Sequence, residues 1–119
     1  MKISAHPLLT VLSLALLFAS ACNYAKPVMY VHVANHSGHP MENLELKYPT
    51  GSFGLPELRN DQTHRRMVPM GTPCTFSIVF EDQTGKKYAQ DYNIGAKCPT
   101  ELHFDIGAAM KITETEIRR

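Results

Sequence analysis

Short runs of residues that favour β-strands, separated by turn-forming residues about every ten positions, are the feature that most restricts the fold of this chain. The clearest run begins at Cys74, from which every second residue up to Phe80 is apolar. The turn sequence Asp-Gln-Thr-Gly at 82–85 follows, and the returning run carries two tyrosines. This pattern predicts a β-hairpin, and its repetition along the chain is typical of an all-β sandwich or barrel.

Several other segments show the same strand pattern, and turn residues such as glycine and proline separate them. We expect strands at residues 28–35, 42–48, 63–68, 102–106 and 110–117, of which 63–68 and 110–117 would be edge strands. Residues 52–61 are weakly patterned, with Phe53, Leu55 and Leu58 expected to point inward. After residue 22 there is no sustained apolar repeat of helical period, so we expect almost no helix.

One part of this pattern resembles a known class of domains. The run from Val31 to Gly38, followed by Leu44-Glu45-Leu46, is similar to small immunoglobulin-like or transthyretin-like envelope lipoprotein domains. The resemblance covers most of residues 28–119 and implies a small antiparallel β-sandwich. Because such folds serve many purposes, it implies an architecture and little about activity.

The first 22 residues are expected to be a targeting segment. Lys2 supplies a positive start, residues 8–18 are almost entirely apolar, and Ala19-Ser20-Ala21 then precede Cys22. The apolar stretch is shorter than the ~20 residues that a membrane-spanning helix needs. The segment resembles the lipobox of bacterial lipoproteins, which implies cleavage after residue 21 and attachment of lipid to Cys22. Residues 1–21 would then be a cleaved signal helix, and residues 22–27 the lipidated cysteine with a short tether.

The same small residues also fit an ordinary signal peptidase, and the number of cysteines favours the lipoprotein. The chain has three cysteines, so lipidation of Cys22 leaves Cys74 and Cys98 as an even pair. Cys74 opens one strand of the predicted hairpin, and Cys98 follows the end of the other. Since antiparallel strands bring these positions to one end of the sheet, we expect a structural disulfide.

Location and partners follow in part from the same residues. Asn23 stands where an Asp would favour retention in the inner membrane of a Gram-negative cell, so the resemblance implies the outer membrane, facing the periplasm. The membrane would be one partner, through the lipid on Cys22, and an envelope protein of unknown identity another. With 12 basic and 11 acidic residues, the chain lacks the charge that favours binding to nucleic acid.

Histidines near the first predicted turn suggest an alternative function. His36 and His39 flank a Ser-Gly pair, and with Met41 they could offer nitrogen and sulfur donors to copper or zinc. The competing interpretation is an ordinary polar turn with solvated imidazoles, because no motif of closely spaced zinc ligands is present. His32 and His103 are expected on the polar faces of their strands, facing solvent.

We expect no catalysis and no cofactor. The sequence has neither a G-x-S-x-G nucleophile motif nor a glycine-rich phosphate loop. The leading hypothesis is therefore a lipid-anchored, non-catalytic binding or accessory module. The direction of successive strands predicts that the turns at 36–40 and 82–85 share one end, with Ser37, Gly38, Asp82 and Thr84 as a contact tip.

Overall fold

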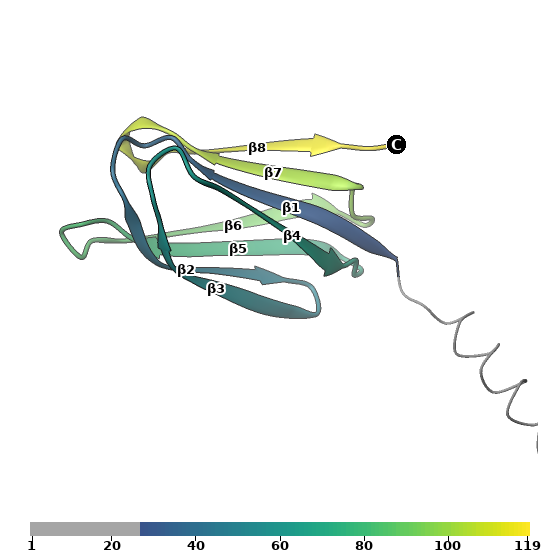
Figure 1. Ribbon diagram of the computed structural model, residues 1–119. Coiled ribbons are helices and arrows are strands. Elements are labelled where there is room, and N and C mark those ends of the chain that lie inside the picture. Colours follow the sequence, from purple (N-terminus) through teal and green to yellow (C-terminus); the bar gives the residue numbers. More distant parts are fainter. Residues whose placement is uncertain (1–26) are drawn as a thin grey trace, which may run out of the picture.

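The computed structural model describes residues 27–119, which form two four-stranded β-sheets packed as a sandwich (Figure 1). The expected signal peptide and Cys22 lie outside the described residues. The strands are β1 (Val28–Asn35), β2 (Met41–Tyr48), β3 (Gly51–Leu58), β4 (Thr63–Pro69), β5 (Cys74–Glu81), β6 (Lys87–Gly95), β7 (Glu101–Ile106) and β8 (Ile112–Ile117). A three-residue 3-10 helix, η2 (Ala108–Met110), precedes β8. Within residues 27–119 no helix has the length and apolar character needed to cross a bilayer.

The strand order is β4-β1-β7-β8 in the first sheet and β3-β2-β5-β6 in the second. This order differs from that of a constant-type immunoglobulin domain, whose sheets hold four and three strands. The structure is a β-sandwich of two four-stranded sheets.

One strand pair departs from the expected antiparallel arrangement. β1 and β7 pair in parallel, whereas every other pair among the described strands is antiparallel. Parallel neighbours need a long connection, and β2 to β6 supply it: β2, β3, β5 and β6 build the second sheet, and β4 returns to the edge of the first. The parallel pair occupies the centre of the first sheet.

The core lies between the sheets and follows the alternation of the sequence. In β1 and β7 the inward residues are fully or almost fully buried, and the same holds for the even-numbered residues of β5. The core residues are Met29, Val31, Val33, Met41, Leu44, Leu46, Phe53, Leu58, Val68, Cys74, Phe76, Ile78, Phe80, Leu102, Phe104 and Ile106. Burial of these side chains is the main force that holds the two sheets together.

The structure shows which of the weakly patterned segments form strands. Residues 51–58 form β3, with Phe53 and Leu58 buried and Leu55 only partly so. β4 and β8 are the two edges of the first sheet, as expected for both. Of the 110–117 segment, Met110 belongs to η2 and the strand begins at Ile112.

The strand connections gather at two opposite ends (Figure 1). We call one end the tip; it comprises the connections 36–40, 59–62, 82–86 and 107–111. We call the other end the base; it comprises the start of β1 and the connections 49–50, 70–73 and 96–100. The turns at 36–40 and 82–85 thus lie at the same end, as the strand directions predicted.

Candidate functional site

Asn35, the last residue of β1, organises the first turn of the tip. Its side chain is fully buried, and its Nδ2 donates to the carbonyl oxygens of His39 (2.8 Å) and Leu58 (2.9 Å). Its Oδ1 accepts from the amide and the hydroxyl of Ser37, at 3.0 and 2.7 Å. A buried amide with all these partners fixes the turn in one conformation.

The neighbouring connections are hydrogen-bonded to this turn. The amide of Gly38, whose φ of 89° suits glycine, donates to Oδ1 of Asn60 at 2.8 Å. The amide of His36 donates to the carbonyl of Ile106 at 2.8 Å, and that of Asp61 to the carbonyl of Asn35 at 2.6 Å. The connections 36–40 and 59–62 therefore form one ordered unit with the ends of β1 and β7.

Asp82 orders the β5–β6 turn in a similar way. Its Oδ1 accepts from the Thr84 amide (2.8 Å), the Thr84 hydroxyl (2.6 Å) and the Lys86 amide (3.0 Å). The Thr84 hydroxyl is the main reason why the pKa of Asp82 lies below its ordinary value, and the two backbone amides add to this effect. Gly85, with a φ of 83°, supplies the left-handed conformation expected from the sequence.

A cavity of about 220 Å³ lies between the two turns. Its walls are formed by His39, Asp82, Gln83, Thr84 and Met110. Two residues of the predicted tip, Asp82 and Thr84, are therefore in its lining, whereas Ser37 and Gly38 support the turn beside it. Met110 was not foreseen, because the sequence placed it in a strand rather than in η2.

The structure does not bring the three expected metal ligands together. Met41 is fully buried in the core, so its sulfur does not join exposed imidazoles at the turn. Asn43 has a φ of 50°, and the β2–β5 register shifts between Glu42 and Glu45. This bulge leaves two successive residues exposed and places Met41 on the same inward face as Leu44, so Met41 is not available as the ligand that the sequence suggested.

The two histidines of that set also separate. Nδ1 of His36 lies 2.8 Å from a carboxylate oxygen of Asp105, on the first sheet. His39 instead lines the tip cavity. Among the described residues, the histidines that do come together are a different pair.

His32 and His103 stack on the outer face of the first sheet. The parallel register of β1 and β7 makes them direct neighbours, and their rings lie 4.1 Å apart with an interplanar angle of 4°. Glu101 projects from the same face, with a carboxylate oxygen 3.7 Å from Nε2 of His103. Sequence alternation placed both histidines on this face, but no local pattern reveals a contact between residues so far apart in the chain.

These imidazoles are less solvated than expected. Nε2 of His32 and Nε2 of His103 are both shielded from solvent and have no hydrogen-bond partner within the described residues. Burial is the largest cause that lowers the pKa of His32; the neighbouring His103 and the charge of Arg65 lower it further, and the Glu101 carboxylate opposes them. His32 is therefore favoured as a neutral imidazole near neutral pH.

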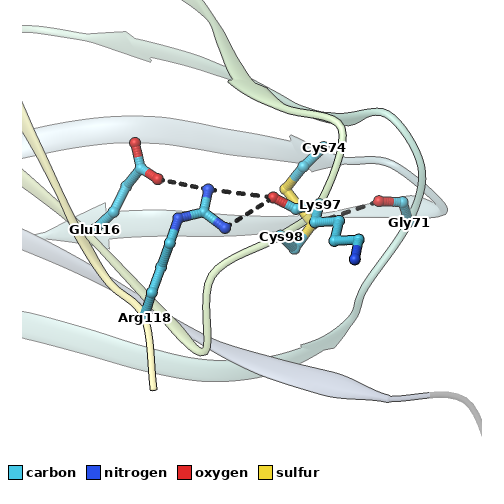
Figure 2. Close-up of a disulfide and its surroundings, with 6 residues drawn as sticks. All are labelled: Gly71, Cys74, Lys97, Cys98, Glu116 and Arg118. Atoms are coloured by element: carbon cyan, nitrogen blue, oxygen red, sulfur yellow. Dashed lines mark hydrogen bonds and ion pairs between the residues drawn. A yellow bond between two sulfur atoms is a disulfide. The ribbon is translucent and has the colours of Figure 1, made fainter.

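The disulfide between Cys74 and Cys98 is present at the base (Figure 2), which confirms the expected pairing. The two Cα atoms are 5.1 Å apart. Beside it, the guanidinium of Arg118 donates to the carbonyl oxygen of Lys97 and pairs with Glu116 at 2.8 Å. The covalent link and this arginine together tie the 96–100 connection to β5 and to the end of β8.

Comparisons with known proteins add information on the fold. No protein-family model matches the sequence, and a search of curated proteins gives no match. Among solved structures, the NMR structure of a protein from Eubacterium rectale is similar, with a TM-score of 0.59 and 9% sequence identity. The similarity covers 77% of this chain and 90% of that one. At this identity it supports the β-sandwich fold alone.

Proposed function

We propose that this chain is a lipid-anchored, non-catalytic binding module of the cell envelope, which contacts a partner protein through its tip. The observation that carries the proposal is the arrangement of the two ends. The tip lies at the opposite end of the sandwich from the start of β1, where the proposed tether joins (Figure 1). Residues of the tip line the 220 Å³ cavity. An anchor on Cys22 would leave the tip free to meet a partner.

The length of the proposed tether supports this orientation. Residues 23–27 separate Cys22 from β1, and five extended residues reach at most about 17 Å. A domain tethered so closely keeps its base near the bilayer, with the tip pointing away. Asn23, rather than an aspartate, favours the outer membrane as the site of attachment, with the domain in the periplasm.

The chemistry of the tip supports a protein partner. The cavity combines the partly buried side chain of Met110 with polar groups from two turns. The Asn35 and Asp82 networks hold both turns in place before binding, which reduces the entropy lost when a complex forms. Mixed polar and apolar character on preorganised loops is typical of protein contact surfaces.

Site-specific photocrosslinking in intact cells tests the tip. A photoreactive amino acid would replace Gln83 at the tip or, as the matched control, Lys97 at the base. We expect one discrete protein adduct from position 83, identified by mass spectrometry, and its loss when His39→Glu is added. Equal adducts from both positions, or an adduct that His39→Glu leaves unchanged, would contradict a specific tip contact.

A separate experiment tests the anchor. Replacing Cys22 with Ser removes the proposed lipid attachment site, so we expect the protein to move from the membrane fraction to the soluble periplasmic fraction. Intact-mass analysis of the unaltered protein should show an acylated N-terminal cysteine. An unmodified residue 22 would support cleavage by the ordinary signal peptidase instead.

A further inference from the structure

We propose that His32, His103 and Glu101 form a binding site for a divalent late first-row transition-metal ion such as Zn²⁺ or Cu²⁺. One possible ligand atom from each residue lies within 4.8 Å of those from the other two. Two imidazole nitrogens and one carboxylate are a donor set that these ions favour. The site lies on the outer face of the first sheet and is separate from the proposed contact surface at the tip.

The two central strands of the first sheet supply the scaffold. His32 of β1 and His103 of β7 are register neighbours, and Glu101 precedes His103 by two residues and so shares its face. β4 and β8 flank the pair on either side. The three side chains therefore come from a backbone that is hydrogen-bonded along both edges, which limits the cost of ordering a metal site.

The unsatisfied hydrogen-bonding capacity of the donor atoms supports a bound ligand at this position. Nε2 of each imidazole is shielded from solvent and has no hydrogen-bond partner among residues 27–119, although buried polar atoms are normally paired. The 3.7 Å separation between Nε2 of His103 and Glu101 is too long for a good hydrogen bond. A bound cation would satisfy both nitrogens and neutralise the carboxylate.

Coordination requires a small rearrangement of the side chains. Two ligands of a tetrahedral zinc ion, each about 2.0–2.1 Å from the metal, lie roughly 3.3 Å from one another. The rings must therefore leave their parallel stack and converge, which rotation about the side-chain bonds allows. A cavity of about 460 Å³, lined by both histidines and Thr115, offers room for this movement and for a water as a further ligand.

The charged groups around the site have opposing effects. Arg65, the register neighbour of His32 on β4, disfavours a cation. Its guanidinium carbon lies 3.9 Å from the centre of the Tyr30 ring, which holds this charge over an aromatic face. Asp105, also on β7, adds a second carboxylate to the cavity wall.

Calorimetric titration of the mature lipidated protein in detergent tests the site, with Zn²⁺ and Cu²⁺ as separate probes. We expect one equivalent of at least one ion to bind, with affinity reduced at least about tenfold in His32→Gln and in His103→Gln. His39→Gln, at the tip, is the matched control and should bind like the unaltered protein. Circular dichroism and the melting temperature would show that each variant is folded.

If a histidine variant fails to fold, a Glu101 variant and the absorption spectrum of bound Co²⁺ test the same site. Glu101→Gln preserves the shape of a side chain on the outer face and should also weaken binding. Co²⁺ added to the unaltered protein should give visible absorption bands of a nitrogen- and oxygen-ligated ion, which Glu101→Gln should alter. Failure of both probe ions to bind, or binding that survives loss of His32, His103 and Glu101, would overturn the proposal.

Discussion

Asn35 of β1 donates a 2.9 Å hydrogen bond to the backbone carbonyl of Leu58 at the end of β3, and this bond joins the two sheets at the tip. The two residues belong to different sheets and are 23 positions apart in the chain. Both are buried, so the bond lies where the hydrophobic core meets the turns. The order of the proposed contact surface therefore depends on a polar group within the core.

Asn35→Ala should destabilise the domain by about 2–3 kcal/mol, because it removes the side-chain donor to the buried carbonyl of Leu58 and the acceptor for the amide and hydroxyl of Ser37. Urea denaturation followed by fluorescence or circular dichroism measures the change in unfolding free energy. Asn93→Ala, on an exposed position of β6, is a matched control and should change stability little. Equal stability of the Asn35 variant and the control would show that the network does not hold the tip.

Loss of the disulfide should lower the unfolding free energy more strongly. The bridge closes a loop with a sequence separation of 24 residues, for which the chain-entropy relation gives about 3.5 kcal/mol. Cys74→Ala combined with Cys98→Ala should show this loss in urea denaturation under non-reducing conditions. Adding a reductant should destabilise the unaltered protein and leave the double variant unchanged; a reductant effect on both would point to another cause.

His64→Phe should make the domain less sensitive to mild acid. The His64 ring lies 5.6 Å from that of Phe53, and burial, followed by the nearby charge of Arg66, lowers the pKa of His64. In the unaltered protein the unfolded chain takes up this proton more readily, so stability falls as the pH drops below about 6.5. The variant should lose less stability over this range.

The size of this difference should remain below about 1 kcal/mol, because His64 is only partly buried and water screens its charge. Melting temperatures measured from pH 7.5 down to pH 5 would detect it, with His39→Gln as a control at the tip. A variant whose stability falls as steeply as that of the unaltered protein would contradict the role given to His64.

Glu114→Gln should stabilise the domain at neutral pH. Burial is the largest cause that raises the pKa of Glu114, and Glu116 raises it further. The unaltered protein therefore loses stability as the pH rises from about 4 through the raised pKa, while the amide has no charge to bury. The gain should be below about 1 kcal/mol at pH 7, since Glu114 is partly solvated.

Thermal unfolding at pH 7 and at pH 3.5 would test this expectation. The advantage of Glu114→Gln should disappear at the lower pH, where the carboxyl group is protonated in both the folded and the unfolded state. Asp91→Asn, on the exposed surface of β6, controls for the loss of one negative charge. A stabilisation that persists unchanged at pH 3.5 would show that the effect is not electrostatic.

Much of the fold could be predicted because strand patterns are local. Val31 and Val33, or Phe76 and Ile78, repeat every two residues, which matches the alternation of side chains across a sheet. Turn residues at 82–85 set the direction of the returning strand, and the positions of Cys74 and Cys98 then follow. In each case the number of residues between two positions is enough to predict whether their side chains lie close together.

The all-β class, most of the strands, the turn at Asp82 and the disulfide could be predicted from local residue patterns. Three features could not: the parallel pairing of β1 with β7, the inward position of Met41 and the stacking of His32 on His103. The strand pairing and the histidine stack depend on β1 and β7, which are separated in the chain by all strands of the second sheet. The position of Met41 depends on the bulge at Asn43. No local periodicity specifies such features, because they arise only when both sheets bury their apolar faces against each other.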